Sequence, residues 1–117
     1  MSNQLKVVAV TACVTGVAHT YMAAEILKKE CKKQEFQLKI ETQGILGSEY
    51  TITGKDVEEA DIILLTKDID LIGKERFICH GRIIKVGIKD IMMNINKVVH
   101  AINKLSKLSK GHTLDIL

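Results

Sequence analysis

Apolar positions along the chain alternate between short unbroken runs and longer stretches with helical spacing. Strands covered on both faces are typically continuous aliphatic runs, whereas amphipathic helices repeat apolar residues every three or four positions. Unbroken runs predict strands over residues 5–11, 61–66 and 82–86, and an alternating segment predicts a further strand over residues 36–42. Helical spacing predicts helices over residues 15–33, 55–60 and 88–105, with at most a short helical turn near residues 73–77.

Two segments refine this outline. In residues 36–42 apolar and polar residues alternate, which favours a strand with one more exposed face, at an edge of the sheet; its polar positions are Gln37, Lys39 and Glu41. Thr53 precedes the short helix and has the side chain of an N-cap residue.

Strands that alternate with helices require right-handed crossovers and therefore a parallel sheet. We expect an α/β fold of the Rossmann-like kind, a three-layer sandwich with a four-stranded parallel sheet in the order 2-1-3-4 and helices on both faces. Residues 1–108 are expected to form one domain and residues 109–117 a flexible C-terminal tail. Ligands of such sheets bind beyond the carboxyl ends of the strands, where the strand order switches. That point is the end of the first strand.

Composition narrows the class of protein. The chain has 117 residues, of which 46% are hydrophobic and 3% aromatic, so one aliphatic core is expected. Its three cysteines form no CxxC pair and are odd in number, which favours a reducing, cytosolic setting. No apolar run is long enough for a membrane span, and no signal peptide is visible. The net charge of +3 is modest, and the C-terminal lysines favour a solvated helix face over an acidic partner surface.

The first strand ends at a cysteine, and a loop of small and hydroxyl residues then leads into the first helix. Residues 11–25 read TACVTGVAHTYMAAE. The first turn of a helix leaves backbone N–H groups unpaired and binds anions, and a thiol beside it becomes a better nucleophile. We therefore predict Cys13 as the nucleophile, with Thr11 and Gln43 as possible neighbours. The predicted phosphate-binding residues are Val14, Thr15, Gly16, Val17, Ala18, His19 and Thr20.

No lysine or arginine lies between Val7 and Leu27, although phosphatase and nucleotide sites usually add one. A site that holds a phosphoryl group without a fixed cation suits a carrier that must pass the group on. The sequence therefore favours phosphoryl carriage over phosphate hydrolysis.

This loop resembles the phosphocysteine loop of the fructose-type IIB component of the bacterial sugar phosphotransferase system, whose pattern is close to T-A-C-P-T-G-x-A-H-T-x-M-A-A-E. The resemblance covers about residues 5–105 and includes four later signatures, at residues 41–44, 60–64, 68–70 and 76–77. Val14 stands where the family usually has proline, which restores a backbone N–H and resembles the fructose-like branch.

The resemblance implies that Cys13 accepts a phosphoryl group from a phosphohistidine on the IIA component. Cys13 would pass it to a sugar, fructose or a fructose-like sugar, held by the membrane-embedded IIC component. The resemblance also implies a cytoplasmic protein, recruited to the inner face of the membrane through IIC. It requires no cofactor, no metal and no nucleic acid, and it does not identify the sugar.

Two other functions stay open at this stage. A small cysteine-dependent phosphatase has a similar loop but needs an arginine in it and an acid, for which Asp68 or Asp70 are candidates. A regulatory IIB-like module that senses phosphorylation is the second alternative. Cys31 and Cys79 are expected to be structural thiols. The remaining histidines show no metal-binding spacing and are expected to face solvent; they are His80, His100 and His112.

Overall fold

The computed structural model describes residues 5–12, 18–44, 47–77, 82–107 and 112–115. All structural statements below concern these residues. The elements are β1 (Lys6–Ala12), α1 (Ala18–Lys33), β2 (Gln37–Gly44), β3 (Gly47–Glu49), α2 (Gly54–Glu59), β4 (Ile62–Thr66), the 3₁₀ helix η1 (Lys74–Phe77), β5 (Arg82–Val86), α3 (Ile88–Met93), α4 (Ile95–Ser106) and β6 (His112–Asp115).

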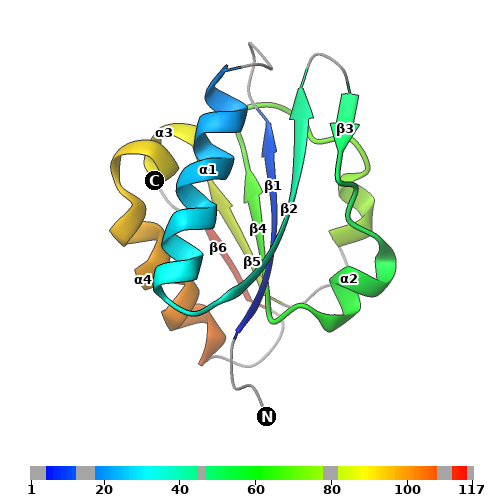
Figure 1. The fold of residues 1–117 in the computed structure, drawn as a ribbon. Helices are drawn as coiled ribbons and strands as arrows, with labels where there is room; N and C mark the ends of the chain where they lie inside the picture. The colour runs from blue at the N-terminus through cyan, green and yellow to red at the C-terminus, as the bar shows by residue number, and fades with distance from the viewer. Residues whose placement is uncertain (1–4, 13–17, 45–46, 78–81, 108–111, 116–117) are drawn as a thin grey trace.

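The strands form one twisted sheet in the order β3-β2-β1-β4-β5-β6 (Figure 1). The four predicted strands are β2, β1, β4 and β5; they are parallel and stand in the predicted order 2-1-3-4. The α/β fold is therefore confirmed. Two short strands were not predicted. β3 pairs antiparallel with the end of β2, and β6 pairs parallel with β5.

Strand β6 lies within residues 109–117, which were predicted to form a flexible tail; for His112–Asp115 the structure shows a strand instead. His112–Asp115 pairs with Arg82–Lys85 and extends the sheet beyond β5. A strand of four residues has too little hydrophobic alternation to be recognised in the sequence. It is fixed instead by hydrogen bonds to the open edge of its neighbour, which tertiary structure alone provides.

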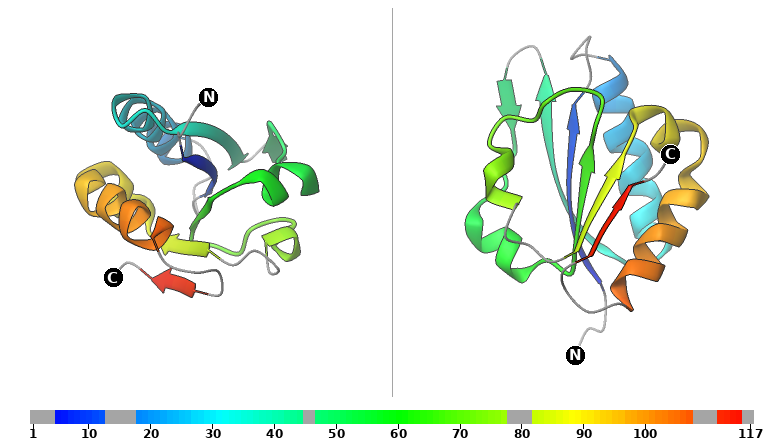
Figure 2. Two further views of the ribbon diagram at one scale, coloured as in Figure 1. Left: turned by 90° about the horizontal axis from the view of Figure 1, so that it is seen from below. Right: turned by 180° about the vertical axis from the view of Figure 1, so that it is seen from behind.

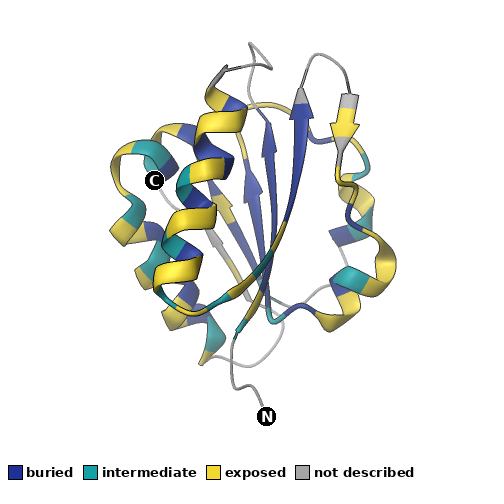
Figure 3. Cartoon of the chain, in the orientation of Figure 1, coloured by how far each residue is buried: buried dark blue, intermediate teal, exposed yellow. Residues whose placement is uncertain are grey.

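Helices cover the two faces of the sheet unequally. One face packs against α1, α3 and α4 in a core that includes Leu27, Ile91 and Ile102. The other face packs against α2 and η1, with Val57 and Phe77 among its core residues. The view from below shows these two layers, and η1 and α2 leave part of the second face open beside β5 and β6 (Figure 2). Buried residues concentrate on the central strands, as Figure 3 shows.

The predicted helix over residues 88–105 is two helices, separated at Asn94. The backbone of Asn94 has φ −134° and ψ 45°, which is not helical, and its N–H donates to the Asp90 carbonyl at 2.8 Å. Asn favours such breaks because its short polar side chain competes with helical hydrogen bonds. The apolar spacing continues through the break, since Ile91 and Val98 both lie in the same core. Periodicity alone therefore did not reveal it.

Candidate functional site

The carboxyl ends of three neighbouring strands meet where the sequence places the site. Ala12, the last residue of β1, is paired with Gln43 at the end of β2. On its other side the Ala12 N–H donates to the hydroxyl of Thr66, the last residue of β4, at 2.9 Å. The same hydroxyl donates to the Ala12 carbonyl at 3.3 Å. The backbone is therefore held from both sides at the residue before position 13.

The start of α1 is bonded to the same strand end. The Thr11 hydroxyl donates to the Thr20 carbonyl at 3.2 Å, and both residues are fully buried. This contact ties the first turn of the helix to β1. Helix α1 begins at Ala18, and His19 is exposed in its first turn. Cys13 and residues 14–17 lie outside the described residues, so their predicted roles stay predictions, as do those of the other predicted site residues.

Gln43, a predicted neighbour of the site, uses its amide to hold the segment that follows β4. Its Nε2 donates to the Ile72 carbonyl at 2.9 Å and to Glu41 Oε2 at 2.7 Å. Its Oε1 accepts the Ile72 N–H at 2.8 Å. The two bonds to Ile72 join the end of β2 to the loop between β4 and η1, and they fix that loop beside the strand ends.

A buried ion pair lies next to Gln43 and was not foreseen. Glu41 is fully buried, although its place in the alternating strand had predicted the more exposed face; that prediction is wrong. Its carboxylate accepts from Arg76 Nη1 at 2.8 Å and Nη2 at 3.2 Å, and from the Ile52 N–H at 2.7 Å. Ile52 and Arg76 of η1 therefore both contact Glu41 on this face of β2.

Arg76 uses all five of its N–H groups within this network. Besides its two bonds to Glu41, Nε donates to the Gly73 carbonyl at 2.7 Å and Nη1 to the Ile52 carbonyl at 2.6 Å. Nη2 donates to the Ile72 carbonyl at 2.9 Å. Burial opposes ionisation of Glu41, yet the bonds from Arg76, Gln43 and Ile52 outweigh it and hold its pKa below the usual value. Glu41, Gln43 and Arg76 are called the buried network below.

A signal for this network was present in the sequence. Glu41, Gln43 and Arg76 fall within the later signatures of the resemblance, at residues 41–44 and 76–77. Hydrophobic alternation shows which face of a strand a residue occupies, but it does not show what covers that face. The pairing of a carboxylate with an arginine 35 positions away required the fold.

Of the two carboxylates proposed as the acid of a phosphatase, one accepts a backbone hydrogen bond and the other is exposed. Asp68 Oδ1 accepts the Ile88 N–H at the start of α3, at 2.8 Å. The Asp70 side chain is 95% exposed and pairs with Lys74 at 3.5 Å. Neither carboxylate is buried, and each already has a partner in the protein.

The remaining candidates behave as structural or surface groups. Cys31 is buried, and burial, assisted by the charge of Glu30, raises its pKa to about 11, as expected of a structural thiol. His100 is exposed, while Cys79, His80 and the His112 side chain lie outside what is described. No group of three or more potential metal ligands exists among the described residues. Within the same residues, none of the helices has the length and apolar character to cross a bilayer.

Comparison with known proteins gives a consistent result. Residues 8–101 match the family described as "PTS system, Lactose/Cellobiose specific IIB subunit", in which PTS denotes the phosphotransferase system. The fructose-like EIIB component 3 of Escherichia coli K12 is 47% identical over 98 residues, which cover 84% of this chain and 86% of that protein.

A crystal structure of a predicted fructose-specific IIB from Escherichia coli aligns with a TM-score of 0.92 and 40% identity, over 97% of this chain and 100% of the other. The fructose-specific EIIB'BC component of Escherichia coli K12 is 47% identical over 70 residues, which cover 60% of this chain and 12% of that longer protein.

Proposed function

The chain belongs to the IIB subunit family of the sugar phosphotransferase system, and we propose that it carries a phosphoryl group on Cys13. Members of this family are phosphotransferases. In the proposed reaction Cys13 receives the group from a phosphohistidine of a IIA component and passes it to a sugar bound by a membrane IIC component.

The observation that carries this proposal is the position of residue 13 in the chain. It directly follows Ala12, which Thr66 holds through both its N–H and its carbonyl. Five residues later α1 begins, and Thr11 bonds its first turn to β1. A helix N-terminus presents unpaired N–H groups and a positive dipole end to an anion. A thiolate between these two anchors suits the transfer of a phosphoryl group.

The proposed chemistry consists of two in-line displacements. The thiolate sulfur of Cys13 attacks the phosphorus of phosphohistidine, so a P–S bond forms, the P–N bond breaks and the imidazole nitrogen takes a proton. A sugar hydroxyl then attacks the same phosphorus, the P–S bond breaks and the thiolate leaves, while the proton of the hydroxyl passes to a base or water. Backbone N–H groups of residues 14–20 would stabilise the charge on the phosphoryl oxygens.

The buried network supports carriage rather than hydrolysis. A cysteine phosphatase would hold the phosphate with a guanidinium, but Arg76 donates all five N–H groups to protein acceptors. Asp68 accepts the Ile88 N–H, and Asp70 pairs with Lys74, so both proposed acids have other partners. A phosphoryl group that is held mainly by neutral N–H groups is released more readily than one that is held by a fixed cation.

The names of the relatives support the proposed IIC partner and the proposed sugar. One relative is named a fructose-like EIIB component, and another is named a single EIIB'BC component. We infer that this chain acts with a IIC component at the cytoplasmic face of the membrane and that its sugar is fructose or a fructose-like sugar. Only the transfer from Cys13 to the sugar depends on this inference, because the transfer from the IIA component to Cys13 comes first.

Phosphorylation of the purified chain tests the proposal. Incubation with a phosphorylated fructose-type IIA protein should add one phosphoryl group, seen by intact mass spectrometry. The bond should have the acid and base stability of a thiophosphate. Cys13→Ser should not be labelled, and Cys31→Ala should be labelled like the unmodified chain. An unlabelled wild-type chain, or a fully labelled Cys13→Ser, contradicts phosphoryl carriage on Cys13.

A further inference from the structure

A cavity of about 410 Å³ lies on the sheet face opposite α1, α3 and α4. It is bounded by β4, β5 and β6 on one side and by the segment from Lys67 to Phe77 on the other. It exists because α2 and η1 cover only part of this face (Figure 2). On β5, Ile83 is buried, whereas Lys85, two residues further on the same face, is exposed.

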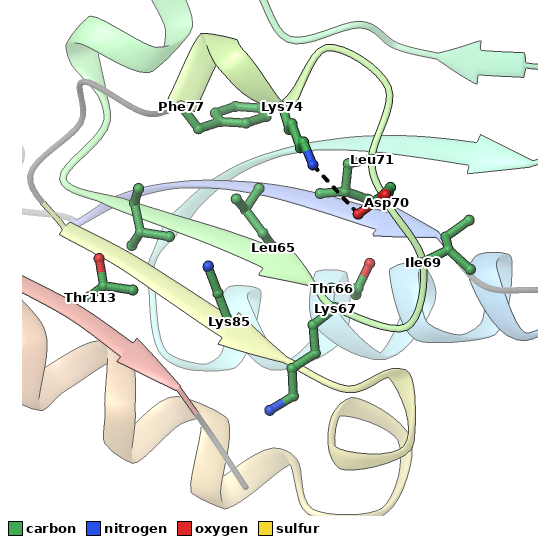
Figure 4. A pocket seen from close by; sticks show the side chains of 11 residues that line it. Leu65, Thr66, Lys67, Ile69, Asp70, Leu71, Lys74, Phe77, Lys85 and Thr113 are labelled. Carbon is green, nitrogen blue, oxygen red and sulfur yellow. Dashed lines mark ion pairs between the residues drawn. The ribbon is translucent and has the colours of Figure 1, made fainter.

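The cavity combines an apolar floor with a cationic rim. Leu65, Ile83 and Phe77 are buried apolar residues of its lining. Lys74 comes from η1 and Lys85 from β5, so two ammonium groups approach the floor from different elements (Figure 4). The described residues of the lining include three lysines and one aspartate, which leaves two positive charges.

Asp70, the one carboxylate among the described lining residues, does not neutralise this rim. Asp70 and Lys74 are 3.5 Å apart, and their side chains are 95% and 61% exposed. Exposed ion pairs of this kind contribute little, about 0–1 kcal/mol. Lys74 can therefore exchange Asp70 for a better anionic partner at small cost.

We propose that this cavity binds a small amphipathic organic phosphate, with its apolar body against Leu65, Ile83 and Phe77 and its phosphate between Lys74 and Lys85. The volume lies within the range of small-molecule sites, about 300–1,000 Å³. Burial of an apolar body supplies the affinity, and lysines bind phosphate as mobile point charges. The lining includes Thr66, which also anchors Ala12, but occupancy of the cavity does not depend on phosphoryl transfer at Cys13.

Titration of the isotope-labelled chain with 1-naphthyl phosphate tests this proposal by NMR. The shifts of residues 13–20 are followed in the same spectra, so that a phosphate site there is distinguished from the cavity. The amide shifts are expected to cluster at Leu65, Leu71, Ile83 and Thr113. Lys85→Glu should weaken binding about tenfold or more, because a charge beside the phosphate is reversed.

Matched variants separate a specific site from general charge attraction. Lys104→Glu makes the same change in net charge on α4, which covers the opposite face, and should leave the affinity unchanged. Lys74→Glu should weaken binding as much as Lys85→Glu does. Agreement between the two variants, which lie on different elements, would show that the loss is not a local distortion caused by one substitution. Equal weakening by Lys104→Glu, shifts confined to residues 13–20, or equally tight binding of uncharged 1-naphthol would each overturn the proposal.

Discussion

Removal of the Arg76 guanidinium should leave a buried carboxylate without its counter-charge. In Arg76→Met the long side chain is kept, but Glu41 loses two charged hydrogen bonds and keeps only those from Gln43 and the Ile52 N–H. Breaking a buried pair in this way costs roughly 3–5 kcal/mol. Because the Arg76 side chain is 20% exposed and water can enter, we expect about 3 kcal/mol. A domain of this size is stable by roughly 5–15 kcal/mol, so the loss is large.

Urea unfolding followed by circular dichroism measures this loss, with the slope of the transition compared between variants. The double variant Glu41→Gln/Arg76→Met removes the unpaired charge as well. Its free energy of unfolding should therefore exceed the value expected from adding the two single losses, by at least about 1 kcal/mol. Additive losses, or a loss below about 1 kcal/mol in Arg76→Met, would refute the reasoning.

The pH dependence gives a second, independent check. In the wild type the pKa of Glu41 is lowered from 4.5, so its contribution to stability is complete above about pH 4.5 and is lost as the pH falls through the folded-state pKa. In Arg76→Met burial is no longer opposed by the guanidinium, so the pKa of Glu41 should rise. Protonation of Glu41 then removes the unpaired charge from the variant. The difference in free energy of unfolding between wild type and variant should therefore shrink as the pH falls from 7 towards 4.5. A constant difference over this range would show that unpaired charge is not the cause.

Three further predictions concern single groups. Thr66→Val removes the hydroxyl that bonds the Ala12 N–H and should lower the free energy of unfolding by roughly 1–3 kcal/mol, measured by urea unfolding; an unchanged midpoint would show that this bond is dispensable. The pKa of Asp56 is lowered to about 2 by hydrogen bonds from Lys39 and from the backbone and hydroxyl of Thr53. Thr53→Ala removes the bond from the hydroxyl and should raise this pKa, which an NMR titration measures. An unchanged pKa would contradict the capping box at α2. Cys31, with a pKa of about 11, should resist iodoacetamide at pH 8 in the folded chain and react in urea, as peptide mass spectrometry can show; rapid reaction of the folded chain would contradict its burial.

The sequence by itself determined the framework of this protein. Three continuous aliphatic runs and one alternating segment predicted four strands, and their alternation with helices predicted a parallel sheet; the predicted order is the observed one. Thr53 was recognised as a cap because its signal is local. The topology predicted Cys13 at the end of the central strand, and the motif around it indicated the family before any comparison.

Only the tertiary structure decided the features that depend on distant contacts. Glu41 looked like a surface residue until η1 brought Arg76 over it, and β6 became a strand because β5 offers an unpaired edge. The open cavity beside β5 likewise depends on where α2 and η1 stop. Local patterns record which residues prefer burial, whereas the partner that covers each face is set by segments far away in the chain.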